Sequence, residues 1–265
     1  MIIRASCFLL PASCLLLLLT ACAPQPLTVT REPVALRLVA ADSCGPLAEE
    51  LAAAYEESYP WITVQVEVWN SALAERTLRE GGADLALLSW LEEVAGEEPL
   101  WSQPFARDGV AVVVYPATPL TEIGLTHLQE IFRGRMQEWV GVVLTAVSRE
   151  EGSGIRVAFE SVVLGNYDAT PTSVVMPSSE AVVEYVARTP GGIGYVSIFR
   201  VDDRVRVLPV EGISPTLAAI SDGSYPLSHP LYLAATAEPA GEAREFAQWV
   251  LGPDGQAIIG KLGNW

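Results

Sequence analysis

Basic side chains are scarce in this sequence. Its 265 residues include 16 lysines and arginines against 32 aspartates and glutamates, which gives a formal net charge of −16. Nucleic-acid binding needs a basic face, so this balance excludes DNA or RNA as a partner. It leaves room for a small anion, because backbone amides and one or two arginines can make a locally positive pocket. Half of the residues are apolar, which argues against global disorder.

Cysteine and histidine are also scarce. Cys7 and Cys14 fall in an apolar leader and Cys22 lies at its end, which leaves Cys44 alone in the rest of the chain. A single cysteine cannot form an intramolecular disulfide. With only two histidines, we expect no metal cluster and no cofactor.

The sequence also lacks the signatures of several enzyme classes and repeat folds. No segment recurs with a period of about 20–50 residues, which excludes solenoids and propellers. The segment "EGSGI" does not match the Gly-x-Ser-x-Gly elbow of serine hydrolases. Cys44 could be a nucleophile only beside a positioned base, and nothing ties it to His229. We therefore expect a protein that is not an enzyme.

The N-terminus has the features of a targeting segment. Arg4 is the only charge before Cys22, and "CFLLPASCLLLLLT" has the composition and length of a signal peptide. It ends in "LLTAC", which resembles the bacterial lipobox. We expect a signal peptide over 1–21, a lipid on Cys22 and a short tether over 22–33. A single transmembrane anchor is the alternative, and in both cases the rest of the chain is extracytoplasmic.

Strands and helices alternate along the rest of the chain, which is typical of α/β layering. Two sets of alternating strands and helices, each with a turn before a helix that could bind an anion, favour two lobes that face a cleft. The sequence therefore predicts an α/β fold with lobe I over 34–116, lobe II over 117–225 and a return to lobe I over 226–265. Strands are predicted at Val34–Ala41, Ile62–Trp69, Ala83–Ser89, Gly109–Pro116 and Val140–Ser148.

The stretch "SREEGSGIRVAFES", Ser148–Ser161, has the elements of an anion site. The first backbone N–H groups of a helix lack partners, and the helix dipole adds positive charge there. Gly152 and Gly154 allow the backbone to approach a ligand closely. Ser153 adds a hydroxyl, and Arg149 adds a charged fork that the two following glutamates can orient. Taken alone, the stretch could also be an ordinary strand–turn–helix with a surface arginine.

A second turn of this kind is "ADSCG", which precedes another helix. The N–H groups of Ser43 and Cys44 could face the same ligand, because both turns follow strands. The alternative for Ser43 is a structural role as the helix N-cap.

Five stretches carry a family resemblance in matching order: "GGADLALLS", "LQEIFRGRMQEW", "REEGSGIRVAF", "PGGIGYVS" and "SDGSYPLSHPLYL". Together they resemble the phosphate-binding-protein family of bacterial ABC importers, over the region from about Val34 onward. The resemblance implies a periplasmic-binding-protein-like type II fold whose two lobes close over one dehydrated oxyanion. The hinge is expected near Tyr115–Pro119 and Gly223–Ser228.

The resemblance also implies the function and the contacts. The chain would be a monomeric, lipid-anchored receptor that captures inorganic phosphate and delivers it to the permease subunits of an ABC importer. Glu151 would brace Arg149 from behind. The expected ligand contacts are Ser43, Cys44, Ser71, Ser89, Arg149, Ser153, Gly154 and Ile155.

Three positions depart from the family pattern. Ser71 lacks flanking glycines, which would place its loop farther from the ligand, and Ile155 replaces a threonine but keeps its N–H. Ser89 stands where some relatives carry an aspartate. A carboxylate there accepts the proton of phosphate and repels sulfate, and Asp42 is the nearest substitute, although it could instead be a turn or cap residue. The same fold binding sulfate, molybdate, tungstate or phosphonate therefore remains an alternative, as does a sensor or adhesion module.

Overall fold

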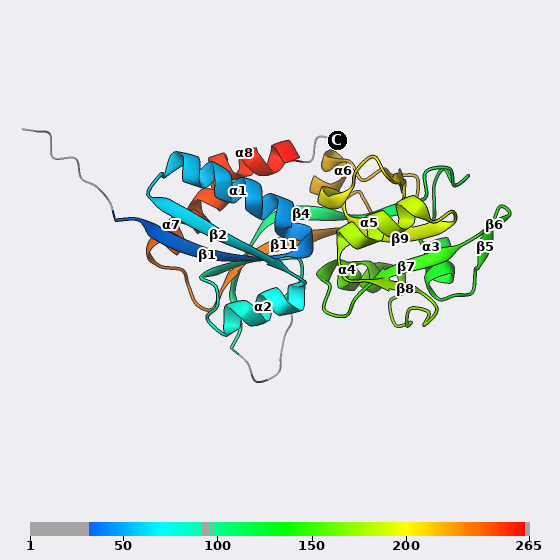
Figure 1. Cartoon of the computed structure of the whole chain (residues 1–265), viewed down its shortest axis with the longest axis horizontal. Coiled ribbons are helices and arrows are strands. Elements are labelled where there is room, and N and C mark those ends of the chain that lie inside the picture. The colour runs from blue at the N-terminus through cyan, green and yellow to red at the C-terminus, as the bar shows by residue number, and fades with distance from the viewer. Residues whose placement is uncertain (1–31, 92–95, 97, 263–265) are drawn as a thin grey trace, which may run out of the picture. The chain divides into compact units, whose positions relative to one another are not determined.

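The computed structural model of the protein describes residues 32–91, 96 and 98–262, in which strands alternate with helices (Figure 1). The predicted leader, Cys22 and nearly all of the tether lie outside these residues. No helix in the described part of the chain is long and apolar enough to cross a membrane. The elements are β1 (Val34–Ala41), η1 (Asp42–Cys44), α1 (Gly45–Ser58), β2 (Ile62–Trp69), α2 (Ser71–Arg79), β3 (Leu85–Leu88), β4 (Trp101–Val114), α3 (Leu125–Phe132), β5 (Glu138–Trp139), β6 (Val142–Val143), β7 (Thr145–Arg149), α4 (Gly154–Val163), β8 (Val174–Met176), α5 (Ser179–Arg188), β9 (Gly192–Ser197), η2 (Ile198–Arg200), β10 (Arg206–Leu208), α6 (Leu217–Ser221), β11 (Ser228–Ala235), α7 (Gly241–Leu251) and α8 (Pro253–Leu262).

The long strand β4 connects two lobes of the α/β fold. The large sheet has the order β2-β1-β3-β11-β4-β9-β7-β8, with β10 beside β4. Up to Gly109, β4 pairs with β11, and from Val110 onward it pairs with β9. The strand thus changes partner before the hinge predicted near Tyr115–Pro119. The predicted lobe boundaries stay a prediction.

Lobe I is built on β1, β2, β3, β11 and the first part of β4. Parallel pairing of β1 with β2 and β3 requires crossover helices, which α1 and α2 provide. Helices α1 and α8 pack together on one face, and α2 packs on β1 and β3 from the other (Figure 1). Leu47, Leu51 and Tyr55 form the buried stripe of α1, as their spacing predicts.

Lobe II is built on β7, β8, β9, β10 and the second part of β4, with α3, α4 and α5. Its core contains stacked rings of Phe159 and Tyr195, with centroids 4.0 Å apart. The Tyr195 hydroxyl shares a 2.7 Å hydrogen bond with Ser148 Oγ and accepts the backbone N–H of Arg149 at 3.3 Å. These bonds fix the end of β7, where the predicted anion-binding stretch begins.

The predicted strand Val140–Ser148 is wrong in its first half. Strands β5 and β6 form a separate two-stranded hairpin, and only β7 joins the large sheet. Val140 lies between the two hairpin strands with a φ of 51° and a side chain that is 68% exposed. An apolar run does not by itself distinguish a buried strand from a short hairpin.

Asp108 lies where β4 leaves the sheet of lobe I, and it is completely buried. Its Oδ1 accepts the backbone N–H of Ile198 at 3.3 Å, and the hydroxyl of Ser197 also bonds the carboxyl group. Its Oδ2 has no hydrogen-bond partner among the described residues. Burial outweighs the bonds that are made and raises the pKa of Asp108 to about 7.

We expect Asp108→Asn to stabilise the protein more at pH 8 than at pH 5. In the wild type, the unfolded chain releases this proton near the ordinary pKa of 3.8 and the folded chain only near 7. Stability is therefore lost as the pH rises between these values, by about 4 kcal/mol at most. Urea unfolding at both pH values measures the difference. An equal gain in the free energy of unfolding at pH 5 and pH 8 contradicts this expectation. The same pH-dependent gain from Asp203→Asn, at an exposed position, also contradicts it.

Candidate functional site

The predicted anion site forms one small cleft of about 150 Å³. Lobe I contributes the helix start after β1, the start of α2 and the residue after β3, and lobe II contributes the end of β7 and the start of α4. Helix starts and the carboxyl ends of strands are favourable places for an anion. The lining residues are Asp42, Ser43, Asn70, Ser71, Ser89, Arg149, Ser153, Gly154 and Ile155.

Arg149 is the cation of this cleft, and its side chain is only 1% exposed. The alternative of a surface arginine is therefore wrong. Its Nη1 donates to Asp42 Oδ2 at 2.9 Å and to Ser179 Oγ at 2.8 Å. Its Nε and Nη2 donate to the carboxylate of Glu150 at 2.9 and 3.0 Å. The guanidinium is held on three sides, so its position is fixed before any ligand arrives.

Buried hydroxyls of lobe I line the same cleft as Arg149. Ser71 Oγ lies 2.9 Å from Ser89 Oγ and accepts the backbone N–H of Gly154 at 3.1 Å. Ser71 is 4% exposed and lines the cleft although glycines do not flank it; the distance of its loop from the ligand stays a prediction. Ser71 lines the cleft because it opens α2, whose first turn points its hydroxyl at lobe II. This group of donors can rearrange around an oxyanion without burying an unpaired polar atom.

Gly152 permits a close approach of the two lobes, whereas its predicted approach to a ligand stays a prediction. It has a φ of 83°, and a side chain there would bring its Cβ to 2.9 Å from that of Ala72. Its carbonyl accepts the N–H of Ala72 at 3.0 Å, which is a backbone hydrogen bond across the cleft. Glycine is required here both for the left-handed backbone and for the space.

The two helix starts are capped differently. Ser153 is the N-cap of α4, and its Oγ accepts the N–H of Arg156 at 3.4 Å. Ser43 is not an N-cap, because the caps before η1 and α1 are Ala41 and Cys44, neither with a side-chain bond. The structural alternative for Ser43 is therefore wrong. Its buried side chain lines the cleft instead.

Cys44 alone among the expected contact residues does not line the cleft. Its side chain is completely buried in the apolar core, and burial, with the charge of Asp108, raises the pKa of its thiol. The thiolate that nucleophilic catalysis needs is disfavoured, so only its backbone N–H is suited to a ligand. No group of His, Cys, Asp and Glu suited to a metal ion occurs in the described part of the chain.

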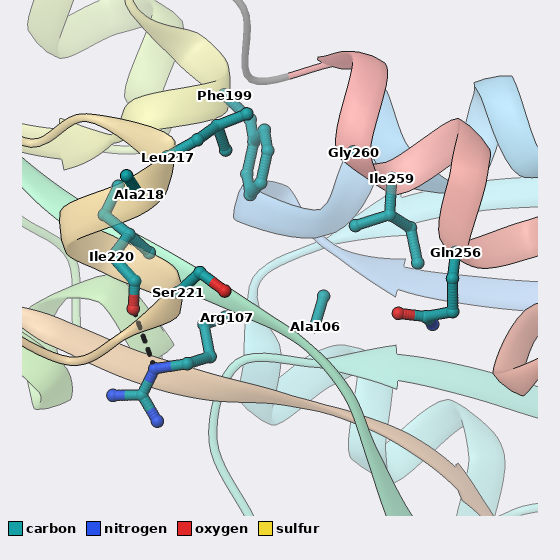
Figure 2. Close-up of a pocket in the computed structure, with 10 residues that line it drawn as sticks. All are labelled: Ala106, Arg107, Phe199, Leu217, Ala218, Ile220, Ser221, Gln256, Ile259 and Gly260. Carbon is teal, nitrogen blue, oxygen red and sulfur yellow. Dashed lines mark hydrogen bonds between the residues drawn. The ribbon is translucent and has the colours of Figure 1, made fainter.

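A larger cavity, with an empty volume of about 860 Å³ against about 150 Å³ for the cleft, shares no residue with it (Figure 2). Elements α6, α8, η2 and β4 line it, largely with apolar side chains such as Phe199 and Ile259. The guanidinium of Arg107, beside it, donates to the carbonyl of Ile220 at 3.0 Å and to Ser228 Oγ at 2.9 Å. Because this cation is already engaged, the cavity is poorly suited to a small anion.

Comparison with known proteins decides the family. A family model described as the PBP superfamily domain matches residues 28–254. The chain belongs to this family. The phosphate-binding protein PstS of Bacillus subtilis (strain 168) is 27% identical over 223 residues, which cover 81% of this chain and 74% of that protein.

Two solved structures agree with this chain in fold. A Clostridium perfringens structure with bound phosphate has a TM-score of 0.79 at 25% identity, and an ABC-type phosphate transport receptor from Vibrio cholerae has 0.71 at 27%. Each alignment covers 86% of this chain and 98% of the other. The resemblance to the phosphate-binding-protein family and the expected α/β fold are thereby confirmed.

One role expected in this PBP-superfamily chain falls on the neighbouring residue. Glu151 was expected to brace Arg149, but Glu150 does so with two hydrogen bonds. Glu151 is exposed, and its charge acts on Arg156. Strand β7 ends at Arg149, so the strand alternation that would place residues two apart on one face no longer applies.

Asn70 is a lining residue that the sequence did not reveal. Its side chain accepts the N–H of Leu73 at 2.9 Å and so caps α2. An asparagine directly before a helical stretch is a helix-start signal, and helix starts are where this cleft is built. That helix-start signal could have placed Asn70 in the cleft.

Proposed function

We propose that the chain is an extracytoplasmic, lipid-anchored substrate-binding protein that captures phosphate for an ABC importer. The observation that carries this proposal is the meeting of a buried arginine, serine hydroxyls and two helix starts from both lobes in one cleft. Such groups are donors suited to a tetrahedral oxyanion. Relatives in Bacillus subtilis and Vibrio cholerae are named for phosphate binding and phosphate transport, which supports phosphate as the ligand.

Capture would proceed without covalent chemistry. The hydroxyls of Ser71 and Ser89 would turn from each other toward the oxygens of the ion, and the N–H of Gly154 would follow. Arg149 would supply the opposing charge. The chain would act as a monomer, and release to membrane permease subunits would require the lobes to separate about β4 and β11.

The choice of anion is tested by titrating phosphate and sulfate. Asp42 is the only carboxylate that lines the cleft among the residues that the structure describes. Near neutral pH, phosphate carries a proton that it can donate to a carboxylate, whereas sulfate has no proton to donate. The difference should be about 1–3 kcal/mol, the scale of one hydrogen bond to a charged group. Calorimetry on the chain from Ala23 onward should therefore show phosphate binding about 5- to 150-fold more tightly.

Other outcomes of the same titration decide between the alternatives. Tighter binding of sulfate, molybdate, tungstate or phosphonate would reassign the ligand within the same fold; Ser89, which replaces the aspartate of some relatives, makes this the main competitor. Binding of no anion, together with capture of a protein partner, would favour a sensor or adhesion module and contradict the proposed function.

The lipid anchor is tested separately. If Cys22 is acylated, the wild-type chain should sediment with membranes and Cys22→Ala should be released from them, because two acyl chains anchor stably. A variant that stays membrane-bound would favour the single transmembrane anchor.

A further inference from the structure

Asp42 joins the two lobes through bonds made entirely by the chain. It follows β1 of lobe I, and its side chain is 17% exposed. Its Oδ2 accepts the backbone N–H of Ser179 at 3.1 Å and the Ser179 hydroxyl at 2.5 Å, besides Nη1 of Arg149. Its backbone carbonyl accepts Nε and Nη2 of Arg200 at 2.9 and 2.7 Å. All three partners follow β4 in the chain and belong to lobe II or to the turn after β9.

The carboxylate of Asp42 is charged under ordinary conditions. Burial alone would raise its pKa, but the charges of Arg149 and Arg200 and the hydrogen bonds from Ser179 outweigh burial and lower it. The bonds between the lobes are therefore charge-assisted, which makes them stronger than bonds between neutral groups.

Asp42 also occupies part of the hydrogen-bonding capacity of Arg149. A guanidinium has five N–H groups. Asp42 and Ser179 take both on Nη1, and Glu150 takes Nε and one on Nη2. One N–H on Nη2 remains. An oxyanion that grips Arg149 with two hydrogen bonds must therefore replace an existing acceptor, and Asp42 is the one that moves away when the lobes separate.

We propose that Asp42 is an interlobe latch. While no anion is bound, it holds lobe II through Arg149, Ser179 and Arg200. When an oxyanion enters, the oxyanion replaces Asp42 as a hydrogen-bond acceptor of Arg149. Asp42 is a positioning residue with an autoinhibitory effect, because the ion competes with an internal carboxylate. The release step rests on the proposed function, whereas the holding step does not.

Hydrogen exchange in the anion-free chain tests the holding step. The N–H groups of Ala72 and Gly154 bond across the lobes to Gly152 and Ser71 without touching Asp42, so their exchange reports lobe separation. With Asp42→Ala, we expect both amides to exchange about tenfold faster or more, the scale of one charge-assisted bond. Adding inorganic phosphate should restore their protection. Small-angle scattering should show a larger radius of gyration that phosphate reverses.

A matched control is Asp84→Ala, which breaks an ion pair with Arg37 (2.6 Å) that lies wholly within lobe I. It should leave exchange at Ala72 unchanged. If Asp42→Ala does not fold, Ser179→Ala removes a hydroxyl bonded to both Asp42 and Arg149 and should give a smaller increase. Unchanged exchange at Ala72 in the folded variants overturns the latch. Faster exchange that phosphate does not reverse in Ser179→Ala, which keeps the Asp42 carboxylate, supports the latch and counts against phosphate as the ligand.

Discussion

Replacing Arg149 with alanine is expected to abolish tight phosphate binding. Among the described residues, the substitution removes the only cation that lines the cleft; it leaves the carboxylate of Glu150 without its partner and takes one charged donor from Asp42. Removing one member of a buried ion pair costs about 3–5 kcal/mol. If the ligand depends on the same guanidinium, its affinity should fall by about 150-fold or more. Isothermal titration calorimetry with phosphate measures the loss.

Two further variants separate binding from folding. Arg149→Lys keeps the positive charge but not the planar fork, so it should fold well and bind with intermediate affinity. Arg188→Ala removes an arginine that is 76% exposed and pairs with Glu184 on the surface of α5, and it should bind phosphate like the wild type. Wild-type affinity in Arg149→Ala would remove the basis for an anion site at this cleft.

The parts of the site that the sequence reveals are those encoded locally. Glycines on either side of Ser153, directly before an apolar helical stripe, mark a helix start, and a strand before them places Arg149 beside it. The same reasoning at Ser43 places the second helix start. Both positions line the cleft, because the carboxyl ends of strands in an α/β sheet share one edge.

The parts that the sequence does not reveal depend on contacts between distant residues. Asp42 and Ser179 are 137 positions apart, and no local pattern predicts that a carboxylate after β1 will accept the first N–H of α5. The hairpin at Val140 is missed for a different reason, since an apolar run carries no information about which strand it pairs with. Contacts between residues distant in the sequence decide both the bond between Asp42 and Ser179 and the hairpin at Val140.

Gly154→Ala is expected to weaken phosphate binding without weakening the fold. An alanine Cβ at this position would lie closer than 3.0 Å to the hydroxyl oxygens of both Ser71 and Ser89. Gly154 is the first residue of α4 and its φ lies outside the left-handed region, so alanine fits the backbone and has the better helix propensity. The methyl group would instead push lobe I and lobe II apart at the cleft.

The expected loss of affinity follows from the cost of forcing an extra methyl group into a packed space, about 1–3 kcal/mol, or about 5- to 150-fold. Thermal unfolding should stay close to that of the wild type while calorimetry shows the loss. Gly260→Ala in α8 is the matched control, since a Cβ there meets nothing within 4 Å. Because the N–H of Gly154 and the hydroxyl of Ser71 are both among the groups proposed to hold the anion, unchanged phosphate affinity in Gly154→Ala would mean that the anion is not held between these two helix starts.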